Sequence, residues 1–231
     1  MADTVTASLT NVVNFITAAG GLGTAAMGLV DALKAFRGGP SNLGFGYIGK
    51  AVHPFLPAGG GTRFTGSDAM QTLKANWMNG VPTADQKAKA KALIHLGITP
   101  ANAPALAGLA GVNPVAFTDL ATNVANGDSP TANQINTLGQ FDVVLGAILD
   151  TAYERADQKY RNGCKLLATI ISVALGLVGG YTVFGADGYL WGPHFWLSGF
   201  VGLIATPLAP VAKDLVSSLQ ASANAIGFLK R

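Results

Sequence analysis

The longest apolar run in the chain covers residues 166–184 and is followed by a second apolar run at 189–212. From Leu166 to Ala186, 21 consecutive residues carry no charge. A helix rises about 1.5 Å per residue, so this length suffices to cross a hydrocarbon core about 30 Å thick. The pattern predicts a transmembrane hairpin over residues 166–212.

A third uncharged stretch lies near the N-terminus and runs for 27 residues, from Thr4 to Val30. Its apolar residues can share one broad helix face, which predicts a transmembrane helix within residues 1–37. An amphipathic or buried helix of a soluble bundle is the alternative. Small residues recur at every fourth position, at Gly20, Thr24 and Gly28. In lipid this spacing lets two helices approach closely.

Residues 38–66 are rich in glycine and proline, which predicts a connector without regular structure. Its aromatic residues, Phe45, Tyr47 and Phe55, are expected at the headgroup level of a membrane. The glycines at 59–61 do not indicate a phosphate-binding loop, because no Lys-Ser/Thr pair follows them.

Residues 67–130 have the polarity of a soluble helical domain. A capping box, Thr83 with Gln86, predicts one helix start. Three further starts are predicted where a capping residue precedes proline, at Thr99-Pro100, Asn113-Pro114 and Ser129-Pro130. The lysines are interpreted as a solvated face, with contact to anionic headgroups as the alternative; they are Lys87, Lys89 and Lys91.

A second capping box, Thr131 with Gln134, opens an amphipathic stalk helix over residues 131–165, and no proline separates it from the second span. Apolar residues at steps of three and four form a seam for another helix, at Ile135, Leu138, Phe141, Leu145 and Ile148. Within the span, Gly176 and Gly180 form a GxxxG pair. Residues 213–231 are predicted to form a C-terminal amphipathic helix.

Charge is scarce and unevenly placed. Charged residues make up 12% of the chain, about half the usual share, and the net charge of +3 gives no basic patch for nucleic acid. All 15 lysines and arginines lie between the first and second spans or after the third. By the positive-inside rule, the middle domain and the C-terminus are cytoplasmic, and the N-terminus and the 185–195 turn lie outside a plasma or bacterial inner membrane.

Residues suited to catalysis or metal binding are few. None of His53, His95 and His194 has a second ligand one helical turn away, and each is interpreted as a satisfied or solvated histidine. Cys164, the only cysteine, excludes an intramolecular disulfide, and Asp31 is expected to pair with Lys34. The sequence therefore predicts no catalytic residue, no cofactor, no metal site and no small-molecule substrate.

These patterns together predict an all-α integral membrane protein with about three transmembrane helices and a small cytoplasmic domain. We expect a non-enzymatic scaffold or accessory subunit that associates with the lipid bilayer and with copies of itself or other membrane proteins. One alternative is an oligomeric pore lined by polar span residues, namely Asn11, Asn14, Thr17, Thr24, Ser172 and Thr182. The other is a soluble helical protein that buries the hydrophobic hairpin.

Overall fold

The structure is a computed structural model that describes residues 2–34, 38–57 and 65–229, and every regular element among them is helical. The chain divides into two compact units. Unit 1 comprises residues 1–40 and 161–231, and unit 2 comprises residues 41–160. The loop glycines 59–61 lie outside the described residues. So do four of the basic residues, namely Arg37, Arg63, Lys230 and Arg231.

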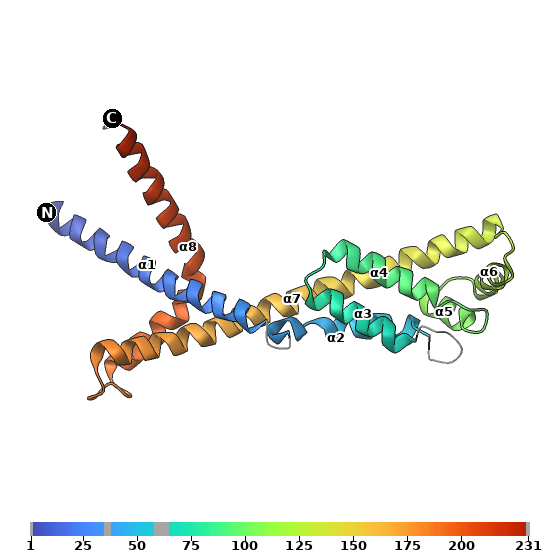
Figure 1. The fold of residues 1–231 in the computed structure, drawn as a ribbon, viewed down its shortest axis with the longest axis horizontal. Helices are drawn as coiled ribbons and strands as arrows, with labels where there is room; N and C mark the ends of the chain where they lie inside the picture. Colours follow the sequence, from blue (N-terminus) through green and yellow to red (C-terminus); the bar gives the residue numbers. More distant parts are fainter. Residues whose placement is uncertain (1, 35–37, 58–64, 230–231) are drawn as a thin grey trace. The chain divides into compact units, whose positions relative to one another are not determined.

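Unit 1 contains α1 (Ala2–Leu33), the second part of α7 (Ala132–Phe184) and α8 (Pro193–Leu229). In Figure 1, α1 and α8 cross each other, and α8 bends along its length. Pro207 and Pro210 lie inside α8, and an internal proline removes a backbone hydrogen bond and kinks a helix. The predicted C-terminal helix of residues 213–231 is therefore not separate, because α8 continues without a break to Leu229.

Three helices of the described chain are long and apolar enough to cross a membrane. The segments concerned are Asn11–Leu33, Ala132–Phe184 and Pro193–Ser218. The second is a single helix of 53 residues, so the predicted stalk and the apolar run of residues 166–184 form one continuous element. This continuity follows from the absence of proline between residues 131 and 192.

Unit 2 packs six short helices and the first part of α7 around one hydrophobic core. The short helices are α2 (Phe45–Val52), the 3₁₀ turn η2 (His53–Phe55), α3 (Gly66–Met78), α4 (Thr83–Leu96), α5 (Ala103–Ala110) and α6 (Pro114–Asn126). Another 3₁₀ turn, η1 (Gly39–Asn42), precedes them. Phe141 of α7 is central to the core: its ring stacks on Phe117 at 4.7 Å and meets the edge of Phe55 at 6.2 Å.

The connector prediction for residues 38–66 is wrong in its middle part. Residues 45–55 are helical, and Ile48, Val52 and Phe55 are buried in the core of unit 2. Phe55 therefore does not lie at a headgroup level. Three or four apolar side chains on one face of a short helix gain enough from burial to outweigh the low helix propensity of the glycines.

The predicted helix starts are right where the capping side chain reaches a free backbone N–H group. Asn113 Oδ1 accepts from the N–H groups of Val115 and Ala116. The Thr131 and Gln134 side chains cap each other's backbone N–H groups. Ser129-Pro130 starts no helix, because Thr131 caps α7 instead.

At two other predicted starts the predicted capping is wrong, although α4 does begin at Thr83. Thr83 is the first residue of α4 rather than its cap, and Gln86 donates to the Val81 carbonyl oxygen. Thr99 and Asn102 bond each other ahead of α5, which begins only at Ala103. The sequence interpretation also missed the capping box of Thr65 and Asp68, in which the Thr65 hydroxyl and N–H donate to the carboxylate and lower the pKa of Asp68.

The seam predicted on the stalk is shifted at its ends. Phe141 and Leu145 are fully buried, and Leu138 and Ile148 pack partly against the core. Ile135, however, is exposed, and the buried line continues along α7 through Leu149, Tyr153 and Ala156. The shift arises because unit 2 covers α7 from α4, α2 and α6 together, rather than along one narrow two-helix seam.

Candidate functional site

In unit 1, α7 and α8 meet closely through small residues. A methyl group built on Gly176 would lie 2.7 Å from the Ser198 carbonyl oxygen, and one on Gly202 would lie 2.5 Å from Val173 Cα. A methyl on Gly180 would overlap Ser198 Oγ. The structure therefore places both glycines of the predicted GxxxG pair at this contact, together with Gly202, which the sequence interpretation did not single out.

Hydroxyl groups complete the α7–α8 contact. Ser172 is fully buried, and its Oγ donates to the Gly202 carbonyl oxygen at 2.6 Å and lies 3.3 Å from Thr206 Oγ1. Small residues and hydroxyl bonds between helices are typical of packing in lipid, where no water competes for the hydrogen bonds. Because Ser172 is enclosed here, it does not line an open path, as the pore alternative would require.

Of the three small residues predicted on α1, Gly20 lies at the crossing of α1 and α8, and Thr24 and Gly28 do not. Gly20 contacts Ala212, and Gly23 contacts the backbone of Ala205, so closely that an added methyl group would overlap either neighbour. Gly28 has open space where a methyl would stand, and Thr24 Oγ1 donates to the Gly20 carbonyl of its own helix. The buried face of α1 instead recurs at steps of three and four, at Ala19, Gly23, Ala26 and Val30.

The turn between α7 and α8 carries a dense aromatic cluster. Tyr189 is buried and its hydroxyl donates to the Leu177 carbonyl oxygen at 2.9 Å. The His194 ring stacks on Phe184 at 4.1 Å. Trp191 and Trp196 are exposed, and Trp191 has a φ of 64°, a left-handed conformation that is uncommon for a bulky residue. Exposed tryptophans beside an apolar helix end are typical of a membrane interface.

Large apolar side chains cover the outside of the unit 1 helices. Only 22%, 11% and 33% of the most apolar windows of the three candidate spans are buried, so most of each window faces outward. The exposed residues include members of every span, such as Phe15, Leu29, Ile170, Val178, Val183, Phe200 and Leu203. A soluble protein rarely exposes so continuous an apolar surface.

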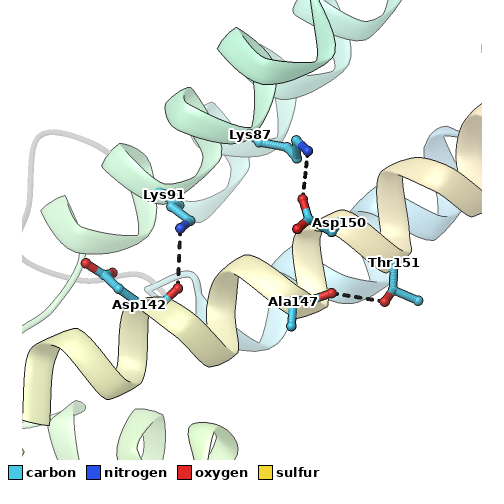
Figure 2. Close-up of polar contacts among 6 residues, drawn as sticks. All are labelled: Lys87, Lys91, Asp142, Ala147, Asp150 and Thr151. Carbon is cyan, nitrogen blue, oxygen red and sulfur yellow. Dashed lines mark hydrogen bonds and ion pairs between the residues drawn. The ribbon is translucent and has the colours of Figure 1, made fainter.

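In unit 2, polar contacts join α4 to α7 (Figure 2). Lys87 Nζ lies 2.7 Å from Asp150 Oδ1, and Lys91 Nζ donates to the Asp142 carbonyl oxygen at 3.3 Å. His95 Nε2 lies 2.7 Å from Asp142 Oδ1, so this histidine has a partner. The solvated-face interpretation holds only for Lys89, because Lys87 and Lys91 face α7.

Two buried polar atoms of unit 2 have no hydrogen-bond partner among the described residues, namely Gln86 Oε1 and Tyr153 Oη. Burial raises the pKa of Tyr153 to about 12. Trp77 packs against the Tyr153 ring at 6.4 Å and donates its indole N–H to the Ser41 carbonyl oxygen at 2.7 Å. Because its ring is buried and packs against Trp77, the tyrosine acts as a core residue.

The remaining candidate residues lie apart from one another. His53 is exposed, Cys164 is partly exposed, and Asp31 pairs with Lys34 at 2.6 Å, as predicted. Over the described ranges, no three residues of the His, Cys, Asp or Glu types come together in a way that could hold a metal ion. Of the other predicted pore residues, Asn11 and Asn14 are exposed on α1, and Thr182 Oγ1 donates to the Gly179 carbonyl of its own helix.

Comparison of the chain with known protein families, curated proteins and solved structures gives no match.

Proposed function

We propose that this protein is a non-enzymatic integral membrane scaffold or accessory subunit, in which unit 1 is the membrane anchor and unit 2 is the domain that it holds at the membrane. The observation that supports this most strongly is the apolar surface of the three long helices. Fully burying one large apolar side chain is favourable by about 1.5–3 kcal/mol, so many such side chains facing water would carry a large cost. That cost disappears when these side chains face the hydrocarbon core of a bilayer.

The packing inside unit 1 supports the same proposal. Its helices meet through glycine, alanine and serine, and the hydroxyl of Ser172 bonds across to Gly202. Lipid tails are as apolar as leucine, so the hydrophobic effect does not drive helices together within a bilayer. Close backbone contact and hydrogen bonds between the helices drive their association instead. The exposed tryptophans of the turn fit the headgroup region on one side of the bilayer.

The proposed orientation places unit 2 in the cytoplasm and the 185–195 turn outside, in a plasma or bacterial inner membrane. It rests on the distribution of lysine and arginine along the sequence. Association with copies of itself or with other membrane proteins fits the small-residue faces that the fold leaves open, such as Gly28 on α1 and Gly179 on α7.

Single-cysteine labelling tests the proposal, because Cys164 is the only natural cysteine. In Cys164→Ser backgrounds, Asp187→Cys is expected to react with a membrane-impermeant maleimide applied to intact cells, and Lys89→Cys only after permeabilisation. Both positions are exposed in the structure, so a difference between them reports topology. Equal labelling of both in intact cells, or recovery of the chain in the supernatant after alkaline extraction of membranes, would reject the proposal.

A further inference from the structure

The first part of α7 keeps one side uncovered within unit 2. Two shallow hollows lie along it: one is lined from α5 and α7, the other from α2 and α7, and both include Val143 and Val144. They therefore form one furrow, which runs from Ile135 to Arg155. At about 1.5 Å per residue this is a length of about 30 Å.

The furrow is apolar in its middle part, from Val143 to Ile148, and polar toward both ends. Residues at every fourth position of α7 line it, with Ile135 and Val143 as the large members; Val143 is 72% exposed. Gly139 and Ala147 between them are small, and a methyl group on Gly139 would meet nothing within 4 Å. Figure 2 shows Asp150 directed toward Lys87 of α4 while Ala147 lies on another side of α7. The lysine contacts therefore leave the furrow open.

Charge is present at one end only, and it has one sign. Lys50 of α2 and Arg155 of α7 line that end, and among the described residues no acidic one lines either hollow. Neither cation makes an ion pair or hydrogen bond with any described residue. The opposite end carries the uncharged amides Asn136 and Gln140.

We propose that this furrow, defined by Ile135, Gly139, Val143, Ala147, Lys50 and Arg155, binds an amphipathic helix of a partner protein that has acidic residues at one end. A helix laid in an apolar groove contributes apolar anchors at steps of three and four. Its carboxylates meet Lys50 and Arg155, which selects an acidic partner. A second copy docked furrow to furrow is the poorer occupant, because its own furrow brings no carboxylate to these cations. The proposal concerns unit 2 alone and goes beyond the anchoring function of unit 1.

Peptide binding to the full chain tests the proposal. The chain is placed in nanodiscs of zwitterionic lipid, and empty nanodiscs give the background. The probes are fluorescein-labelled 21-residue leucine/alanine helices with three glutamates at the N-terminal or the C-terminal end, and matched peptides with lysines at the same positions. Fluorescence anisotropy gives the dissociation constants.

One glutamate peptide is expected to bind about tenfold more tightly than its lysine counterpart, as two favourable charge pairs at a partly desolvated site allow. The double variant Lys50→Glu/Arg155→Glu should reverse this preference. Lys89→Glu is the matched control, since Lys89 is exposed on α4 outside the furrow, and it should change nothing. Val143→Ser should weaken both peptides, and circular dichroism checks that each variant folds.

Three results would overturn the proposal: neither glutamate peptide binds, the glutamate preference survives the double reversal, or Lys89→Glu removes the preference as strongly. Efficient oxidative cross-linking of Ala147→Cys between copies, in a Cys164→Ser background, would also overturn it by assigning the furrow to a second copy. Any of these can occur while the chain stays in the membrane, so failure here is separate from failure of the anchoring proposal.

Discussion

Unit 2 and unit 1 are both helical, yet they bury opposite kinds of side chain. The buried residues of unit 2 are mostly large, with Phe117, Phe141 and Leu145 at the centre. The buried residues of the unit 1 helices are mostly small, such as Ala205 and Ser172, while leucine, valine, phenylalanine and tryptophan face outward.

The difference indicates which solvent each unit is built for. In water, a core of large apolar side chains supplies the main stabilisation. In lipid, large side chains gain nothing from leaving the solvent, and helices associate through close backbone contact at small residues. The contrast can be tested by enlarging or shrinking residues in each unit and measuring the loss of stability.

Shrinking the core of unit 2 should have the largest effect. Phe141→Ala removes a fully buried ring and is expected to lower the free energy of unfolding of unit 2 by about 3–5 kcal/mol. Denaturant unfolding of the full chain, followed by Trp77 fluorescence in a Trp191→Phe/Trp196→Phe background, measures it. Val143→Ala on the exposed side of the same helix is the control and should change it by less than about 0.5 kcal/mol. Equal effects at both positions would mean that Phe141 is not a core residue.

Enlarging a small residue should damage unit 1 instead. Gly202→Leu places a side chain against the backbone of Ser172 and Val173 and should destabilise the α7–α8 contact by about 1–3 kcal/mol. Unfolding in mixed micelles of increasing sodium dodecyl sulfate content measures it. Gly179→Leu is the matched control: a Cβ atom at Gly179 meets nothing within 4 Å, so this substitution should be tolerated. If both glycines tolerate leucine, the close contact is not what holds these helices together.

Removing the hydroxyl bond between the spans should have a modest effect. Ser172→Ala loses the bond to Gly202 and is expected to cost about 0.6 kcal/mol in the same micelle assay, the average for such bonds in membranes. Thr169→Ala serves as control, because Thr169 Oγ1 bonds only to the Lys165 carbonyl of its own helix. A larger loss for Thr169→Ala than for Ser172→Ala would argue against a hydrogen-bonded α7–α8 contact.

At neutral pH the smallest effect is expected at Tyr153, and it depends on pH. Its folded-state pKa, about 12, lies above the ordinary value near 10, so the unfolded chain loses the proton first. The stability that the neutral phenol contributes is complete below pH 10 and decreases as the pH rises toward 12. Tyr153→Phe should therefore be nearly neutral at pH 7, since no hydrogen bond is lost, and should retain more stability than the natural chain above pH 10. Parallel curves for the two proteins between pH 9 and 12 would refute this.

Much of this architecture is readable from the sequence, because it depends on local patterns. Long uncharged runs predict the apolar helices, and caps such as Asn113 and Thr131 act on N–H groups only two or three residues away. Features that depend on a distant neighbour were missed. α2 forms because its apolar face is covered by the rest of unit 2, which outweighs its glycine content.

The candidate contacts of unit 1 show the same limit. The spacing of Gly176 and Gly180 marks small residues correctly, but any face of a glycine-rich helix offers such a spacing. Which face is used depends on where α8 crosses, so Gly23 is in contact and Gly28 is not. Likewise, Lys87 and Lys91 look like solvated residues until α7 supplies their acceptors.

The three tryptophans allow the central claim, that the outside of unit 1 faces lipid, to be measured most directly. Trp191 and Trp196 belong to unit 1 and Trp77 belongs to unit 2. The chain is reconstituted in bilayers whose acyl chains carry bromine close to the headgroups, which quenches tryptophan emission on contact. The Trp77→Phe variant, which reports Trp191 and Trp196, should lose most of its emission. The Trp191→Phe/Trp196→Phe variant, which reports Trp77, should keep it. Equal quenching of the two variants, or no quenching of Trp191 and Trp196, would contradict the claim.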